Sequence, residues 1–407
     1  MQTYLVNLYN TNGADLTDSR IGHILKNVGV EPASIPILSK KSKFTPVMIK
    51  SVKTSWANII KQEMLACGGD AAISRCSYNC SQEYSDVLLL GTEAGILRFL
   101  DKMKAQPECF SKLEQDIRSL FYPAKDAAKV LVGKRSFDLK KDFLILGILN
   151  LTPDSFSDGG RYNTYDAGMK RAEELLSDGA DLIDVGGEST RPVSKDITGL
   201  EELERVMPVL EAIKKNFGPV VSIDSYKPEV ISSAIEQGVV MVNDISSGEG
   251  IKEVIDKIVA NDVSVVSMMN SSQGSYKGSS PEIDIGSPLE KFMDFCIEQK
   301  SFLDQKGLSP NRIIFDPGIG FGLSTNDISR LIKNVYSVTS KNIAVCMGLS
   351  RKSYIGRITG LKTKDSDSIG QAISLFLIEQ GVRIFRTHEA RALKDVINFH
   401  QSIEGIN

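Results

Sequence analysis

The sequence is poor in cysteine and has no long apolar run. Six cysteines in 407 residues are too few for the dense disulfide framework of small secreted domains. Cys67, Cys76, Cys80 and Cys109 precede residue 130, but they form no CxxC pair and only His23 could join them. We therefore expect reduced thiols rather than a zinc site. The longest apolar stretches, such as FLILGIL at 143–149, are too short to cross a bilayer.

An excess of charge of one sign is also missing. The formal net charge is -3, whereas nucleic-acid binders present a basic face to phosphate backbones. We therefore expect no nucleic-acid partner, while a local basic pocket for a small anion remains compatible with this balance. The N-terminal MQTYLVNLYNTNGADL lacks a basic stretch followed by an apolar one, so we predict no signal peptide. The sequence thus predicts a cytoplasmic protein that does not bind a membrane.

Familiar catalytic motifs are absent as well. No nucleophile elbow, HExxH or GxxxxGK[ST] occurs in the sequence. The glycines of 318–322 give GxGxG, which indicates a tight loop that lets backbone approach a ligand rather than a dinucleotide fingerprint. Ser350, Ser353 and Cys346 have no base beside them in the sequence, although His388 could approach them in space.

From about residue 143 onward, short apolar runs alternate with helical patterns. The runs are continuous, which is typical of parallel strands covered on both faces. Eight strand–helix units in about 260 residues match a closed (β/α)₈ TIM barrel, and an open doubly wound sheet is the alternative. The predicted strands are LILGILN (144–150), LIDVGG (182–187), VVSID (220–224), MVNDI (241–245), VSVVSMM (263–269), IIFDPG (313–318), IAVCMG (343–348) and IFRTH (384–388).

The first part of the chain has a different pattern. TSWANIIKQEMLACGGDAA predicts a helix that ends at Gly68–Gly69, and DVLLLGTEAGILRFLDKMKAQ predicts a strand, a turn and a helix. We expect a small α/β domain of unknown role over residues 1–130 and the barrel over 131–407. The lysine-rich stretch at 122–142 is interpreted as a linker or connecting helix.

Polar residues follow most of the predicted strands. A single strand-end Asp or Asn is usually a cap or a turn former. Caps do not require Arg, Lys and His beside them, however, and the active site of a barrel lies at the carboxyl ends of its strands. The residues concerned are Asn150, the segment 186–192 (GGESTRP), Asp224, Asn243, Asp244, Asp316, the segment 350–353 (SRKS), Arg386 and His388.

These side chains fall into chemical groups. Asp224, Asn243 and Asp316 offer donors and acceptors that suit a flat heterocycle. Asn150 offers a neutral oxygen that suits Mg²⁺ when phosphates supply most of its ligands. The polar, glycine-containing loops 151–160 and 187–199 are typical of lids. The candidate ligands for a phosphate-like anion are Arg191, Arg351, Lys352, Arg386 and His388.

Seven ordered motifs together resemble dihydropteroate synthase, a family of pterin-binding TIM barrels. They span residues 144–400, and no single one would be specific. The motifs are LGILNLTPDSFSDGG, LIDVGGESTRP, SIDSYKPEV, VNDIS, FDPGIGFG, GLSRKS and RTH. The resemblance implies an enzyme that condenses 6-hydroxymethyl-7,8-dihydropterin diphosphate with 4-aminobenzoate to 7,8-dihydropteroate and pyrophosphate.

The resemblance also implies roles for residues. Asp224, Asn243, Asp316, Phe321 and Lys352 match pterin-binding positions, and Asn150 matches the Mg²⁺ ligand. Arg386 and His388 match the diphosphate site, whereas Phe156, Thr190, Pro192 and Ser353 match the 4-aminobenzoate site. The residues expected to take part in catalysis are Asp158, Thr190, Arg191, Asp224, Lys352, Arg386 and His388.

The expected chemistry is a dissociative substitution. The aromatic amine is neutral at pH 7 and needs no strong base, so losing diphosphate is the difficult step, which Mg²⁺, Arg386 and His388 would assist. The sequence departs from the family at Met269–Asn270, where Met-His-Met sequences are common, and at Ile319, Leu323 and Glu389. These departures concern the contacts of the pocket more than the reaction.

Two other functions remain open. A methyltransferase that moves a methyl group from methyltetrahydrofolate to a corrinoid protein would share the pterin residues but would not need SRKS, RTH or STRP. A non-catalytic pterin-binding subunit would tolerate the altered loop at Met269–Asn270. The resemblance further implies a homodimer, and NIIKQEMLACGGDAA resembles an N-terminal extension of some longer family members.

Overall fold

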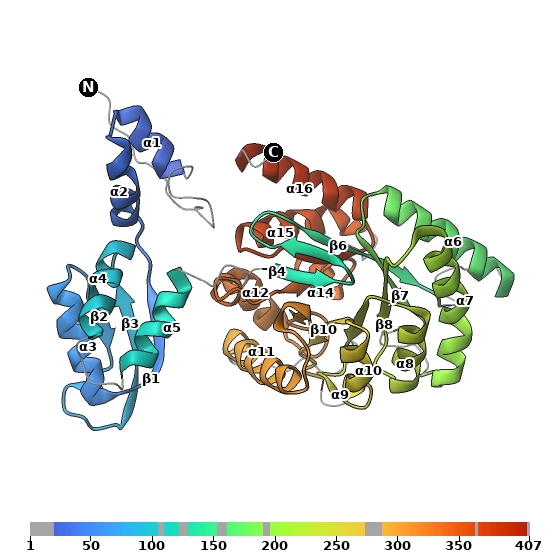
Figure 1. The fold of residues 1–407 in the computed structure, drawn as a ribbon, viewed down its shortest axis with the longest axis horizontal. Helices are drawn as coiled ribbons and strands as arrows, with labels where there is room; N and C mark the ends of the chain where they lie inside the picture. Colours follow the sequence, from blue (N-terminus) through green and yellow to red (C-terminus); the bar gives the residue numbers. More distant parts are fainter. Residues whose placement is uncertain are drawn as a thin grey trace. The chain divides into compact units, whose positions relative to one another are not determined.

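The computed structural model describes residues 20–104, 110–121, 129–152, 161–189, 196–272, 287–362 and 365–404. The chain divides into two compact units, the first up to Ala124 and the second from Lys125 onward, and each is described by itself (Figure 1).

The first unit is a small α/β domain built on a three-stranded antiparallel sheet. The strand order is β1-β3-β2, with β3 in the centre. The predicted helix before Gly68 and the predicted strand–turn–helix are confirmed as α3, β3 and α4. The elements are α1 (Arg20–Val28), α2 (Ile35–Ser42), β1 (Val47–Lys53), α3 (Thr54–Ala66), β2 (Asp70–Ile73), β3 (Tyr84–Leu90), α4 (Glu93–Met103) and α5 (Ser111–Phe121).

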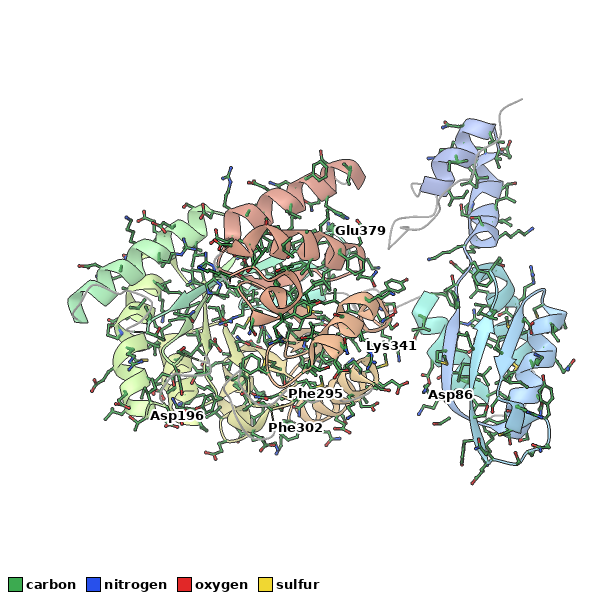
Figure 2. The ribbon with its side chains drawn as sticks, turned by 180° about the vertical axis from the view of Figure 1, so that it is seen from behind. Asp86, Asp196, Phe295, Phe302, Lys341 and Glu379 are labelled. Atoms are coloured by element: carbon green, nitrogen blue, oxygen red, sulfur yellow. The ribbon has the colours of Figure 1, made fainter. Side chains whose placement is uncertain are left out.

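The core of the first unit lies on one face of this sheet. Side chains alternate along β1 and β3, so that Val47 and Val87 are buried while Met48 and Asp86 are exposed. The buried side chains form one apolar cluster with residues of α3, α4 and α5. At the exposed positions, Lys50 forms an ion pair with Asp86. Asp86 is labelled in Figure 2.

A β-hairpin opens the second unit, where a linker or connecting helix was expected. Strands β4 (Lys129–Val132) and β5 (Arg135–Asp138) pair antiparallel around a turn at Gly133. Val130, Val132 and Phe137 pack against the inward side chains at the amino-terminal end of the barrel. The linker interpretation was wrong because KVLV and RSFD alternate as strands do, and their apolar side chains close one end of the barrel.

Eight parallel strands form the barrel, which confirms the predicted fold. They are β6 (Leu144–Asn150), β7 (Leu182–Gly186), β8 (Val221–Asp224), β9 (Met241–Asp244), β10 (Ser264–Met268), β11 (Ile313–Asp316), β12 (Cys346–Met347) and β13 (Ile384–Thr387). The strand order is β11-β10-β9-β8-β7-β6-β13-β12. A bridge between Phe315 and Val345 brings the two ends of this sheet together, so the alternative of an open sheet is wrong.

Helices surround the barrel (Figure 1). They are α6 (Arg161–Ser177), α7 (Gly199–Phe217), α8 (Pro228–Gln237), α9 (Glu249–Lys252), α10 (Ile255–Ala260), α11 (Pro288–Gln305), α12 (Thr325–Asn334), α13 (Tyr336–Thr339), α14 (Ser353–Thr359), α15 (Asp367–Glu379) and α16 (Ala390–Glu404). In the described part of the chain, no helix has the length and apolar character needed to cross a membrane.

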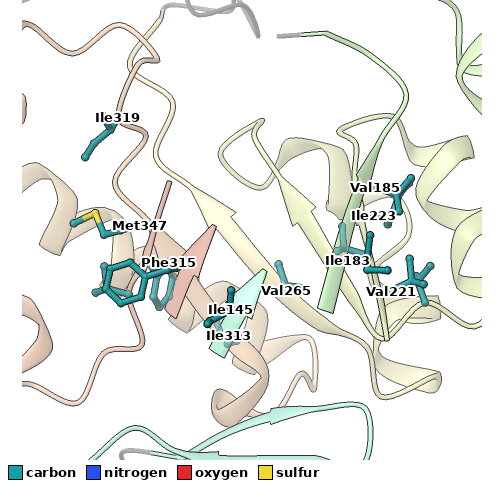
Figure 3. Packing of buried hydrophobic residues seen from close by; sticks show 14 of the residues in the cluster. Ile145, Ile183, Val185, Val221, Ile223, Val265, Ile313, Phe315, Ile319 and Met347 are labelled. Atoms are coloured by element: carbon teal, nitrogen blue, oxygen red, sulfur yellow. The ribbon is translucent and has the colours of Figure 1, made fainter. Parts of the chain in front are cut away.

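Both faces of the strands are buried, which explains their continuous apolar runs. Outward side chains such as Ile183, Val221 and Val265 pack against the helices (Figure 3). Inward side chains are apolar near the hairpin, including Leu146 and Ile384, and become polar toward the carboxyl ends of the strands. The barrel interior therefore delivers polar groups to one end only.

Candidate active site

Strand register aligns the predicted polar residues at the carboxyl end of the barrel. Asn150 on β6 pairs with Gly186 on β7, Gly186 pairs with Asp224 on β8, and Asp224 pairs with Asn243 on β9. Paired residues of parallel strands lie at the same height of the sheet and on the same face. The side chains of Asn150, Asp224 and Asn243 are therefore neighbours along one rim.

A pocket at this rim gathers five predicted residues that belong to five different strands or their following loops. Its polar lining consists of Asp224, Asn243, Asp316, Lys352 and Arg386. Apolar side chains complete the wall, namely Ile245, Met268, Ile319 and Phe321. Concave pockets in which a few polar groups converge among apolar side chains are the usual form of a small-molecule site.

Arg386 lies at the centre of a buried ion cluster. Its Nε donates to Oδ2 of Asp184 at 2.5 Å, and its Nη2 donates to Oδ2 of Asp224. Asp184 also accepts a hydrogen bond of 3.2 Å from Nδ2 of Asn243. Two carboxylates thus fix the guanidinium from two directions, and one of them also orients the neighbouring amide.

Asp184 was not among the residues predicted for the site. Its side chain is fully buried inside the barrel, and it contacts two residues of the predicted set. The available signal was an acidic residue in the middle of the apolar run LIDVG, because a charge is not buried in a strand without a partner. Candidate residues were sought after the ends of the predicted strands, whereas Asp184 lies within β7.

Burial and neighbouring charges shift the pKa values of this cluster. Burial raises the pKa of Asp224 to about 7, with a further contribution from Asp184, while Arg386 opposes the shift. Burial lowers the pKa of Arg386, but Asp224 and Asp184 outweigh it and raise the pKa above the ordinary value. The guanidinium is therefore always charged, whereas Asp224 changes its ionisation near neutral pH.

Asp316 is buried at the end of β11 and shaped by the glycine loop behind it. Its Oδ1 accepts a hydrogen bond of 2.7 Å from the Gly318 amide, and burial raises its pKa. Gly318 has φ +74°, and a Cβ there would lie 2.0 Å from the Met269 carbonyl oxygen. The glycine therefore lets the loop approach the neighbouring backbone, whereas the sequence had suggested close approach to a ligand.

Lys352 enters the pocket from the loop after β12. Its Nζ lies 4.6 Å from the centroid of the Phe321 ring, so the ring supports the ammonium through a cation–π contact. Burial lowers the pKa of Lys352 to about 8, and Arg386 lowers it further, while Asp316 and Asp224 act in the opposite direction. Lys352 is thus a partly buried cation whose charge can be lost in mildly alkaline solution.

His388 lies two residues after Arg386 and contacts Ser350. The Ser350 Oγ is 3.1 Å from Nδ1 of His388 and accepts a hydrogen bond of 3.2 Å from the His388 amide. Burial lowers the pKa of His388 to about 3, and Arg386 and Arg351 add to the shift. The imidazole is therefore neutral, and the predicted approach of His388 to Ser350 is confirmed.

Asn150 and Asp224 lie on either side of Gly186, which pairs with both of them. A Cβ on Gly186 would lie 3.5 Å from Oδ2 of Asp224 and 3.6 Å from Oδ1 of Asn150. Across the described part of the chain, no group of three or more His, Cys, Asp or Glu side chains could hold a metal ion. The donor set available here suits a cation that takes most of its ligands from a bound phosphate.

A second buried ion network supports the rim between β7 and β8. Nζ of Lys227 lies 2.6 Å from Oε2 of Glu188 and 2.7 Å from Oε2 of Glu202. The Tyr226 hydroxyl donates to the same Glu188 oxygen, and Arg205 donates to the Gly187 carbonyl. These bonds tie the residues after β7 to α7 and to the loop that follows Asp224.

Two predicted residues lie at the edge of this site. Arg351 has φ +58° and pairs with Glu389 at 2.5 Å and Asp367 at 3.3 Å, so its charge is already compensated by carboxylates. Ser353 begins α14, is exposed, and accepts a hydrogen bond of 3.1 Å from Arg357.

Asn270, one of the departures from the family pattern, ties two loops together. Its Nδ2 donates to the Ile245 carbonyl at 2.9 Å, and its Oδ1 accepts from the Ser272 amide at 2.9 Å. Its own amide donates to the Ser247 hydroxyl at 2.8 Å. Asn270 thus holds the backbone that carries Ile245, a residue of the pocket wall.

Some of the predicted site residues lie outside the described residues. They are Phe156 and Asp158 in the loop after β6, and Thr190, Arg191 and Pro192 in the loop after β7. Their expected roles rest on the resemblance alone.

Comparison with known proteins now bears on this geometry. The model of the pterin binding enzyme family matches residues 146–388. The dihydropteroate synthase of Streptococcus pyogenes serotype M3 is 33% identical over 268 residues, which cover 65% of this chain and 97% of that protein. The chain belongs to the dihydropteroate synthase family of pterin-binding enzymes.

Solved structures of dihydropteroate synthases share the barrel. The Xanthomonas albilineans enzyme, solved with 4-aminobenzoic acid, has a TM-score of 0.63 and 30% identity over 69% of this chain and 99% of its own. The Yersinia pestis enzyme, solved with a sulfonamide drug, has a TM-score of 0.61 and 29% identity over 68% of this chain and 99% of its own. These likenesses favour the synthase over the corrinoid methyltransferase and over the non-catalytic subunit.

Proposed function

We propose that the protein condenses 6-hydroxymethyl-7,8-dihydropterin diphosphate with 4-aminobenzoate to form 7,8-dihydropteroate and pyrophosphate. The observation that supports this proposal is that one pocket is lined by Asp224, Asn243, Asp316, Lys352 and Arg386. A flat bicyclic ring presents donors and acceptors around its edge, and these groups complement it from several strands.

The pterin ring occupies the pocket between Phe321 and the polar wall. Asp316 and Asn243 bind the ring edge through its N–H and carbonyl groups, and Lys352 donates to a ring acceptor. Burial strengthens each of these contacts, because few waters compete with the ligand. Asp224 completes the set, and its pKa near 7 lets it bind as carboxylate or as acid at neutral pH.

The diphosphate lies toward Arg386 and His388. Arg386 supplies charge, and the neutral His388 supplies a hydrogen-bond donor. Asn150 would hold Mg²⁺, which would supply positive charge to neutralise the departing phosphate oxygens. The positions of the oxygen atoms support this assignment, because the Asn150 oxygen and an Asp224 oxygen flank the same glycine, Gly186.

The bond between the pterin methylene carbon and the diphosphate oxygen breaks first, and the amine of 4-aminobenzoate then forms the new C–N bond. The amine loses a proton to the departing pyrophosphate or to water as the product forms. Carboxylates at the ring favour the cation that develops on the methylene carbon, and Arg386 stabilises the charge on the leaving group. No strong base is needed, which agrees with a histidine whose lowered pKa of about 3 makes it a weak base.

The decisive experiment follows pyrophosphate from the purified full chain with Mg²⁺, the pterin diphosphate and 4-aminobenzoate. We expect release that depends on 4-aminobenzoate, together with formation of dihydropteroate. Release without 4-aminobenzoate would indicate hydrolysis, and no release from folded protein would refute the proposal. A sulfonamide should compete with 4-aminobenzoate, because a relative was solved with such a drug.

We also propose that the protein is a cytoplasmic homodimer. Apolar side chains are exposed on two neighbouring helices, Phe376 on α15 and Phe399 and Ile403 on α16. Large exposed apolar residues on adjoining helices are typical of association surfaces. Sedimentation velocity of the full chain tests the dimer, and Phe399→Glu should shift it toward monomer while leaving the barrel folded.

A further inference from the structure

Ser350 makes two contacts with one residue, His388, and both involve the same oxygen. Its Oγ accepts the hydrogen bond from the His388 amide at 3.2 Å and lies 3.1 Å from the ring Nδ1. The His388 carbonyl is also held, because Nη2 of Arg171 donates to it at 2.5 Å. Backbone and ring of His388 are therefore fixed together.

The first bond leaves the Ser350 hydroxyl proton available for the second bond, whose direction depends on the tautomer of His388. The amide can only donate, so one lone pair of Ser350 Oγ is occupied and its O–H remains free to donate. Within the part of the chain that the structure describes, the hydroxyl contacts no acceptor besides Nδ1. Donation from the hydroxyl to Nδ1 requires that Nδ1 carry no proton, so the proton of a neutral imidazole lies on Nε2.

We propose that Ser350 is a positioning residue that fixes His388 in the Nε2–H tautomer and turns this N–H toward a phosphate oxygen of the substrate. Nε2 is separated from Nδ1 by one ring carbon and points away from Ser350, and none of the described residues forms a hydrogen bond with it. The groups around the ring are the cations Arg386, Arg351, Lys352 and Arg171. This arrangement adds a donor to the diphosphate site without adding another buried charge.

The inference rests on the proposed function for its ligand, but the tautomer can be measured without any ligand. The chain contains three histidines, His23, His388 and His400. Long-range proton–nitrogen NMR of the full chain labelled with ¹⁵N-histidine therefore shows three ring systems, and His388→Asn identifies one of them. We expect pyrrole-like Nε2 and pyridine-like Nδ1 for His388. A pyrrole-like Nδ1 in the wild type would overturn the proposal.

Variants at Ser350 separate positioning from folding. Ser350→Ala should leave His388 as a mixture of tautomers, and Ser350→Thr, which keeps the hydroxyl, should restore the wild-type pattern. Ser374→Ala is the matched control, because its hydroxyl donates to Gly370 within its own helix and does not contact His388. An unchanged tautomer in Ser350→Ala would overturn the proposal, and the Thr variant keeps the test valid if the Ala variant misfolds.

Calorimetry with inorganic pyrophosphate and Mg²⁺ tests the consequence. Ser350→Ala should bind pyrophosphate about tenfold more weakly, the usual effect of losing a hydrogen bond to a charged group. The affinity for 6-hydroxymethyl-7,8-dihydropterin, which lacks the diphosphate, should stay unchanged. Equal loss of both affinities would contradict a positioning role. If the wild type binds no pyrophosphate, the diphosphate site of the proposed function fails, while the NMR result still decides the tautomer.

Discussion

Asp184→Asn is the sharpest test of the ion cluster inside the barrel. The substitution keeps the size and shape of the side chain but removes its charge. Arg386 then retains only Asp224 as a charged partner, and the amide oxygen can still accept hydrogen bonds from Arg386 and Asn243.

The expected loss of stability follows from these contacts. Removing one partner from a buried ion pair costs about 3–5 kcal/mol. Because Arg386 keeps Asp224 and asparagine keeps an acceptor, we expect a decrease of about 2–3 kcal/mol in the free energy of unfolding.

The loss should also depend on pH. Asp184 helps to raise the pKa of Asp224, so the variant should lower that pKa from about 7. A raised carboxyl pKa stabilises the fold below the unfolded pKa, and this contribution is lost as the pH rises through about 7. Between pH 5 and 8, the free energy of unfolding should therefore decrease less in the variant than in the wild type. The difference should be about 1.4 kcal/mol for each unit by which the pKa of Asp224 is lowered. Asp184→Asn is thus more destabilising at pH 5 than at pH 8.

Urea unfolding at the two pH values measures this difference. Far-ultraviolet circular dichroism reports on the whole chain, whereas the fluorescence of Trp56, the single tryptophan, reports on the first unit. The unfolding transition followed by Trp56 fluorescence should be the same in the variant and the wild type. Asp244→Asn is the matched control, since Asp244 is equally buried but bonds to Ser246 and Gly248 rather than to a cation. A change below about 0.5 kcal/mol, or a larger loss at pH 8, would refute the ion cluster.

The remaining predictions concern the pocket, its support and the first unit. Lys352→Ala should weaken the binding of the pterin diphosphate, measured by calorimetry, at least about tenfold. The affinity of the wild type should fall as the pH rises through about 8, where Lys352 loses its charge. The control is the same substitution at the exposed Lys341, which is labelled in Figure 2. Lys227→Met should lower the free energy of unfolding, measured in urea, by about 3 kcal/mol because it leaves two buried carboxylates without their cation. Adding Glu202→Gln to this variant should restore part of the lost stability. A Lys227→Met variant as stable as the wild type would contradict this. A protein that consists of residues 125–407 alone should still release pyrophosphate from the substrates. The reason is that a relative matched along 97% of its length covers only 65% of this chain. Loss of turnover by this shorter protein, if it is folded, would assign the first unit a role in catalysis.

The eight strands and their polar ends could be predicted from the sequence for a local reason. A strand buried on both faces must be apolar along its whole length, and parallel strands connected by helices all end at the same rim. Asp224, Asn243, Asp316 and Lys352 were therefore expected at one place before any coordinates were known, and the structure brings them into one pocket. The hairpin at 129–138 was missed because its two strands have four residues each within a lysine-rich stretch, and their burial depends on the barrel they close.

The sequence by itself determined the fold, the family and the rim at which the chemistry lies, because each depends on periodicity and on residue order along the chain. Only the tertiary structure decided which charges meet. Asp184 and Arg386 are 202 residues apart in sequence, and nothing in LIDVG or RTH indicates that they pair. The closed barrel brings β7 and β13 to the two sides of β6, so that their inward side chains share one interior. That enclosure excludes water, and the exclusion of water shifts the pKa values of Asp224, Lys352 and His388.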